Sequence, residues 1–125
     1  EIAALVAEAK LLPILDLAYQ GLGQGMEEDA YGVRRVLAAV PEAIVAYSCD
    51  KNFGLYRDRT GALYVMMAEP GQLKAAMSNG HALARANWSQ PPDHGADLGI
   101  GLPFVSSLAV PWGQCLFKVL LRSFA

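Results

Sequence analysis

The feature that most constrains this sequence is a strand–helix–strand pattern near its beginning. Residues 11–17 are apolar without alternation, which predicts a short parallel strand covered on both faces. Residues 27–39 begin with three acids and continue with apolar residues at helical spacing, so they predict a helix. Residues 43–49 predict a second strand. We therefore expect a right-handed βαβ unit, a unit that places ligand sites at the carboxyl ends of its strands.

The following segments continue an α/β pattern. Residues 62–68 predict a strand that pairs antiparallel beside its predecessor, because no helix fits into residues 52–61. Pro70 suits the first turn of another helix, whereas residues 85–95, which contain two adjacent prolines, predict an irregular segment. The predicted fold class is α/β, a mostly parallel sheet with flanking helices and one antiparallel strand.

Composition excludes several classes of function. The 125 residues carry a net charge of −2 and no basic stripe, which argues against a nucleic-acid partner. Cys49 and Cys115 lie far apart, without metal-ligand spacing or a preceding secretory signal, so we expect thiols in a reducing compartment, the cytoplasm. His81 and His94 have no ligand spacing either, and we interpret both as structural residues with no metal.

The end of the chain differs in composition from the rest. All 12 acids lie at or before Asp97, and the first residue is not a methionine but part of a helical pattern. We therefore expect an incomplete chain whose residues 97–125 form a divergent tail, translated out of frame or unstructured. Residues 102–121 are apolar enough to suggest a membrane span, but Pro103 and Pro111 interrupt them, and we predict no membrane partner.

Polar side chains that suit a phosphate-bearing aldehyde gather around the two predicted strand ends. Asp16 and Tyr19 accompany the first strand end, while Ser48, Lys51 and Arg59 accompany the second. An amine can bond covalently to an aldehyde, a carboxylate can keep a ring nitrogen protonated, and a guanidinium fork matches phosphate oxygens. Lys51 alone would more often be a surface lysine, and Asp16 alone a capped strand end.

A glycine-rich segment lies between these two groups. Gly21, Gly23 and Gly25 have the wrong spacing for a dinucleotide-binding loop, and three acids follow them, where a phosphate would be repelled. We interpret the segment as a flexible turn.

Three motifs in order then resemble one family. Residues 16–21, 48–59 and 85–95 are similar to the class I aminotransferases, most closely the aspartate and aromatic amino-acid aminotransferases. The resemblance covers about residues 1–96. It implies the central part of the large domain of a fold-type I transferase that depends on pyridoxal 5'-phosphate (PLP). It also implies a homodimeric parent that moves an amino group between an aspartate-like or aromatic amino acid and a 2-oxo acid.

The resemblance implies a role for each candidate residue. Lys51 would be the Schiff-base lysine and proton carrier, Asp16 would pair with the pyridinium nitrogen, and Tyr19 with the ring hydroxyl. Ser48 and Arg59 would bind the phosphate.

Arg85 would bind the side-chain carboxylate of dicarboxylic substrates in the partner subunit's site, although an arginine there can also simply cap a helix. Two alternatives remain for the function. The chain could be an inactive fragment with residual PLP binding, or part of a lyase or decarboxylase that has the same fold.

Overall fold

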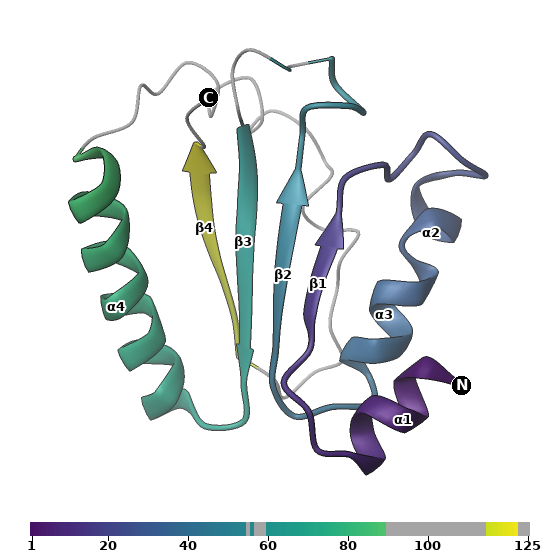
Figure 1. Ribbon diagram of the computed structural model, residues 1–125, viewed down its shortest axis with the longest axis horizontal. Helices are drawn as coiled ribbons and strands as arrows, with labels where there is room; N and C mark the ends of the chain where they lie inside the picture. Colours follow the sequence, from purple (N-terminus) through teal and green to yellow (C-terminus); the bar gives the residue numbers. More distant parts are fainter. Residues whose placement is uncertain (55, 57–59, 90–114, 123–125) are drawn as a thin grey trace.

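The computed structural model describes residues 1–54, 56, 60–89 and 115–122. Its centre is a four-stranded sheet in the order β1-β2-β3-β4, shown in Figure 1. The strands are β1 (Ile14–Leu17), β2 (Ala43–Ser48), β3 (Thr60–Met67) and β4 (Cys115–Arg122). β1 and β2 are parallel, β3 is antiparallel to β2, and β4 is antiparallel to β3. The α/β class and the antiparallel third strand are confirmed.

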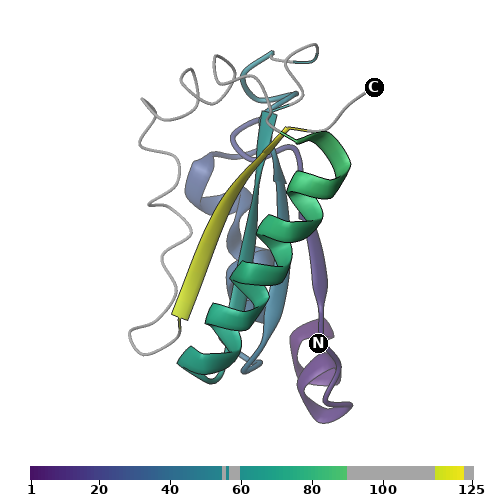
Figure 2. The ribbon, with the colours of Figure 1, turned by 90° about the vertical axis from the view of Figure 1, so that its left-hand side faces the viewer.

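Within the described residues, four helices flank the sheet. They are α1 (Ile2–Glu8), α2 (Met26–Asp29), α3 (Tyr31–Leu37) and α4 (Pro70–Trp88). In Figure 1 the first three lie on the β1 side, whereas α4 runs along the β4 side and contacts β3 and β4. Figure 2 shows β4 inclined relative to the strands behind it, the twist expected of a sheet. None of the described helices is long and apolar enough to span a lipid bilayer.

One face of the sheet holds the core. Along β2, Ala43, Val45 and Tyr47 are buried while the residues between them are only half-buried. Their partners on β3, which are Met66, Tyr64 and Ala62, are buried as well. Val36 and Leu37 are the buried residues of α3, and Leu37 packs into the same core cluster. Alternation along β2 therefore gives one buried and mainly apolar face.

β1 differs from its prediction. The strand covers only Ile14–Leu17, and Ile14 and Asp16 are exposed, while Leu17 is buried. The expectation that both faces of β1 are covered is therefore wrong for the described residues. β1 is an outer strand, and the described elements bury only one of its faces.

The helices also differ in their bounds. The single helix predicted over residues 27–39 is divided into α2 and α3 at Ala30, which is fully buried. α4 continues to Trp88, so the part of residues 85–95 up to Trp88 is helical and not irregular. Arg85 and Ala86 are good helix formers, and the helix ends only at Ser89, whose φ is 58°.

The predicted tail contains a strand. β4 lies within residues 97–125 and pairs along the whole of β3, from Thr60–Arg122 to Met67–Cys115. Residues 115–122 are therefore not unstructured. A domain boundary at residue 96 and an out-of-frame origin for the tail stay predictions.

Candidate active site

The parallel pairing of β1 with β2 brings two predicted site residues to one edge of the sheet. Asp16 is the next-to-last residue of β1 and is in register with Ala46. Ser48, two positions further along β2, is that strand's last residue. Because side chains alternate along a strand, Asp16 and Ser48 project from the same face. The carboxyl edge of the βαβ unit is therefore where the candidate residues meet.

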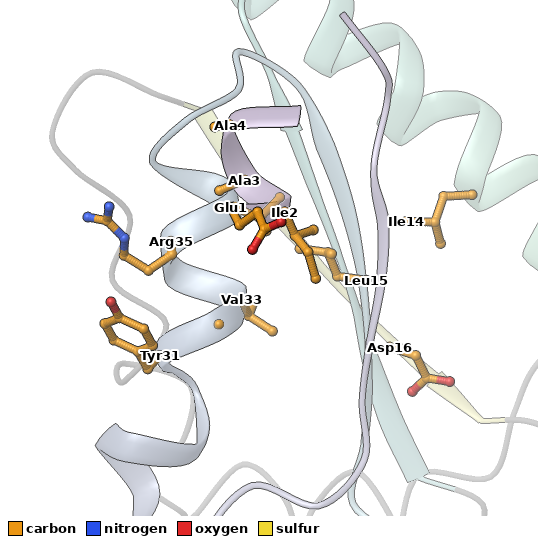
Figure 3. Close-up of a pocket in the computed structure, with 12 residues that line it drawn as sticks. Glu1, Ile2, Ala3, Ala4, Ile14, Leu15, Asp16, Tyr31, Val33 and Arg35 are labelled. Carbon is orange, nitrogen blue, oxygen red and sulfur yellow. The ribbon is translucent and has the colours of Figure 1, made fainter. Parts of the chain in front are cut away.

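Asp16 points away from α3. Figure 3 shows it beside Ile14 on the far side of β1, while Leu15 points toward Val33 of α3. Asp16 is exposed in the described structure. An exposed carboxylate on this face is available to a ligand.

Lys51 and Tyr19 lie side by side. The Nζ atom of Lys51 is 5.5 Å from the centre of the Tyr19 ring. Lys51 belongs to the turn after β2, and Tyr19 to the loop after β1. An ammonium group at this distance is attracted by the face of an aromatic ring. Two residues predicted separately from sequence are thus neighbours in space.

Asn52 connects the same two segments through hydrogen bonds. Its Nδ2 atom donates to the hydroxyl of Tyr47 at 2.7 Å and to the backbone carbonyl of Gln20 at 3.3 Å. Gln20 is completely buried, and its Nε2 atom donates to the carbonyl of Met26 at 2.7 Å. Burial raises the pKa of the Tyr47 phenol far above its usual value, so the phenol stays neutral.

Asp29 organises the glycine-rich loop. Its carboxylate accepts backbone N–H groups from Gly21 and Gly23, both at 2.8 Å, and from Gln24 at 2.9 Å. These bonds, led by the one from Gln24, lower the pKa of Asp29 below its usual 3.8. Amide groups that could have bound a phosphate are thus occupied by the chain's own carboxylate. The loop is therefore more constrained than the flexible turn that we predicted.

Ser48 caps the turn that carries Lys51. Its Oγ atom accepts the backbone N–H of Asp50 at 3.2 Å. Asp50 is buried, with 3% of its surface exposed. Ser48 is also paired in register with Gly61 on β3. A hydroxyl at this strand end thus shapes the lysine turn directly.

The structure describes only some of the other residues that were singled out from the sequence. Arg59 and His94 lie outside the described residues. Arg85 is exposed in the last turn of α4, the helix beside β4 in Figure 1, and His81 is exposed on the same helix. In the described part of the chain, no group of three or more His, Cys, Asp or Glu side chains could hold a metal ion.

Two hollows border this region. A mainly apolar cavity of about 720 Å³ lies between α1, β1 and α3, where Figure 3 shows Ile2, Leu15 and Val33. A second hollow of about 350 Å³ is lined by Tyr19, Gln20 and Asp29 among others. The second hollow adjoins the Tyr19 loop, whereas the lining of the first includes neither Tyr19 nor Lys51.

Sequence reasoning assigned no role in this site to Asn52, Gln20 or Asp29. Each lies within or beside a segment that we had singled out, but asparagine and aspartate are common turn residues. The one available signal was adjacency in the sequence, since Gln20 directly follows Tyr19 and Asn52 directly follows Lys51. Asp29 had been assigned to the first turn of the predicted helix. It is the last residue of the short helix α2, and its carboxylate accepts hydrogen bonds from the preceding loop.

Comparisons with known proteins show which family the chain belongs to. A family model described as aminotransferase class I and II matches residues 1–100. The chain is 54% identical over 96 residues to the tyrosine aminotransferase of Rhizobium meliloti, covering 77% of this chain and 25% of that protein. It is 42% identical over 113 residues to the aspartate aminotransferase of Escherichia coli, covering 90% of this chain and 28% of that one.

Solved structures give the same answer. An aromatic amino acid aminotransferase with 3-indolebutyric acid superposes with a TM-score of 0.75 at 42% identity, over 88% of this chain and 27% of that chain. A mitochondrial aspartate aminotransferase from Trypanosoma brucei superposes with a TM-score of 0.74 at 34% identity, over 86% of this chain and 29% of that chain. The chain thus spans about a quarter of the length of these relatives. It belongs to the class I and II aminotransferase family, with the fold of the fold-type I aminotransferases.

Proposed function

We propose that this chain carries the cofactor-attachment region of a PLP-dependent aminotransferase that acts on aspartate-like or aromatic amino acids and 2-oxo acids. Relatives named tyrosine, aromatic-amino-acid and aspartate aminotransferase support the reaction and the substrate classes. The single observation that carries the proposal is the neighbourhood of the Lys51 amine and the Tyr19 ring.

The donor set fits PLP. The aldehyde and the hydroxyl of PLP are on adjacent ring carbons, so the two side chains that address them must be adjacent too. Lys51 and Tyr19 meet this requirement, since they lie 5.5 Å apart, amine to ring centre. Asp16, exposed on the neighbouring strand, supplies a carboxylate for the ring nitrogen, and Ser48 a hydroxyl for the phosphate. Arg59 is the proposed second phosphate ligand.

Each residue has a defined task in this proposal. When bound, the cofactor supplies an electron sink next to the substrate's α carbon. Lys51 Nζ would hold the cofactor's aldehyde carbon until the substrate amine replaces it, and the amine released in this way would carry the proton removed from the α carbon. Tyr19 donates its phenol hydrogen to the ring oxygen, and Asp16 keeps the ring nitrogen protonated.

The substrate and partner assignments also belong to the proposal. Arg85 is exposed at the end of α4, remote along the chain from Lys51, which is compatible with a task outside its own subunit. We propose that it binds a substrate carboxylate in the second subunit of a homodimer, because a guanidinium fork matches a carboxylate. The cytoplasm is the proposed location.

Reductive labelling tests the proposal. The chain is mixed with PLP, its absorbance is followed in the near-ultraviolet and visible range, and the linkage is reduced with borohydride before mass spectrometry. We expect a cofactor band and a label on Lys51, and we expect Lys51→Ala to abolish both. Lys74→Ala, which removes an exposed lysine of α4, is the matched control and should change neither. Label spread evenly over all lysines of a folded chain would refute the proposal.

Turnover is measured separately from binding. Transfer of an amino group from aspartate or tyrosine to a 2-oxo acid by the purified chain would exclude the alternative of an inactive fragment. Release of carbon dioxide or ammonia without a transferred amino group would instead indicate a decarboxylase or a lyase.

A further inference from the structure

We propose that Asn52 is a positioning residue that sets the Lys51 amine against Tyr19. The inference rests on the proposed function for the tasks of Lys51 and Tyr19, but the contacts of Asn52 stand without it. Asn52 directly follows Lys51, and its bonding partner Gln20 directly follows Tyr19. One side chain therefore joins two backbone segments that are separated by 32 positions along the chain.

Both anchors of Asn52 are fixed in place. The Tyr47 side chain lies in the buried face of β2 and is 7% exposed. Gln20 is 0% exposed, and its bond to the Met26 carbonyl attaches it to the start of α2. The two hydrogens of Nδ2 are thus directed to a strand on one side and to a helix-anchored loop on the other. A displacement of Asn52 would shift the lysine turn relative to the tyrosine loop.

The amide of Asn52 also destabilises the fold through one of its atoms, which argues against a side chain that merely fills space. Its Oδ1 atom is buried and, within the described residues, has no hydrogen-bond partner. A buried acceptor without a partner destabilises a fold by about 1–3 kcal/mol. An apolar side chain of similar size would avoid this cost, but it would lose the two donated bonds. The geometry therefore favours the donated bonds as the reason for an asparagine.

Lysine labelling gives the main test. The chain contains four lysines, Lys10, Lys51, Lys74 and Lys118, so the share of reduced PLP label on Lys51 measures how well that amine is positioned. Asn52→Asp keeps the shape but cannot donate to the Gln20 carbonyl. We expect its label on Lys51 to fall about tenfold, the effect of losing one buried hydrogen bond, at an unchanged circular dichroism spectrum. Asn79→Asp, the same change at an exposed site of α4, should leave the share unchanged.

A second variant covers the case in which Asn52→Asp does not fold. Asn52→Gln keeps the amide and moves it by one methylene. A positioning role therefore predicts a lower share of label on Lys51, whereas a role in hydrogen bonding alone predicts an unchanged share. An unchanged share in a folded Asn52→Asp or Asn52→Gln would overturn the inference.

One measurement needs neither a variant nor a cofactor. In the wild-type chain, the side-chain amide protons of Asn52 should exchange with solvent at least tenfold more slowly than those of Asn79. Equal exchange would overturn the positioning role. If the PLP label on the wild-type chain shows no preference for Lys51, the proposed function is refuted. The exchange of the Asn52 amide protons would still decide whether Asn52 joins the two loops.

Discussion

Lys51 Nζ lies 5.5 Å from the centre of the Tyr19 ring, so the turn after β2 and the loop after β1 meet through their side chains. An attraction of this kind contributes about 0.5–1 kcal/mol at an exposed site, too little to hold two loops in place. The hydrogen bonds of Asn52 to Tyr47 and Gln20 supply a firmer connection. The contact that suits a cofactor is therefore a consequence of the packing beneath it.

The Tyr19→Phe variant should distinguish the role of the Tyr19 ring from the role of its hydroxyl. The ring persists, so we expect PLP label to remain on Lys51, while loss of the phenol donor raises the PLP concentration for half-maximal labelling about tenfold. The concentration is read from a titration followed by absorbance. Tyr31→Phe, at an exposed tyrosine of α3, is the control. An unchanged titration for Tyr19→Phe would exclude a role for its hydroxyl.

The glycine-rich loop should loosen in acid. Because the folded-state pKa of Asp29 is below 3.8, the ionised carboxylate stabilises the folded loop fully above pH 3.8, and this contribution is lost as the pH falls through the lowered pKa. Amide exchange and chemical shifts of Gly21, Gly23 and Gln24 should reveal the change. Asp29→Asn should show the loose loop already at neutral pH, and Glu8→Gln on α1 should not. A loop that responds equally in all three proteins would contradict this role of Asp29.

Two glycine substitutions should have opposite effects on stability. A Cβ atom at Gly61 would collide with the backbone carbonyl oxygen of Tyr47, so Gly61→Ala should lower the free energy of unfolding by about 1–3 kcal/mol. Gly80 of α4 has no neighbouring atom within 4 Å of such a Cβ, and Gly80→Ala should raise it by about 1 kcal/mol. Urea denaturation measures both, and equal shifts would show that the β2–β3 approach is not tight.

The outer strand β1 should promote self-association. Ile14 is 73% exposed there, and an outer strand with apolar side chains invites pairing with another chain. Ile14→Lys should therefore reduce the average mass measured by light scattering at high protein concentration. Leu83→Lys, which adds the same charge at an exposed site of α4, should reduce it less. The reverse order would indicate that α4, not β1, carries the contact.

The sequence by itself determined most of the elements and their order, but not β4 or the division between α2 and α3. Apolar runs and proline positions are local signals, and they sufficed for β1, β2, β3 and the start of α4, and for the meeting of Asp16 with Ser48 at one sheet edge. Local signals failed at the ends of elements, where neighbouring residues can serve equally well as the boundary. For this reason α4 runs past Arg85, and Ala30 divides the predicted second helix.

Only the tertiary structure decided how the loops are joined. The contacts of Lys51 with Tyr19 and of Asn52 with Gln20 connect positions with no periodic relation in the sequence, so no pattern indicates them. The exposure of Asp16 likewise depends on what covers β1, not on the apolar residues beside it. Strands form from local preference and burial, whereas a site at their ends depends on which loop hydrogen bonds the packed core permits.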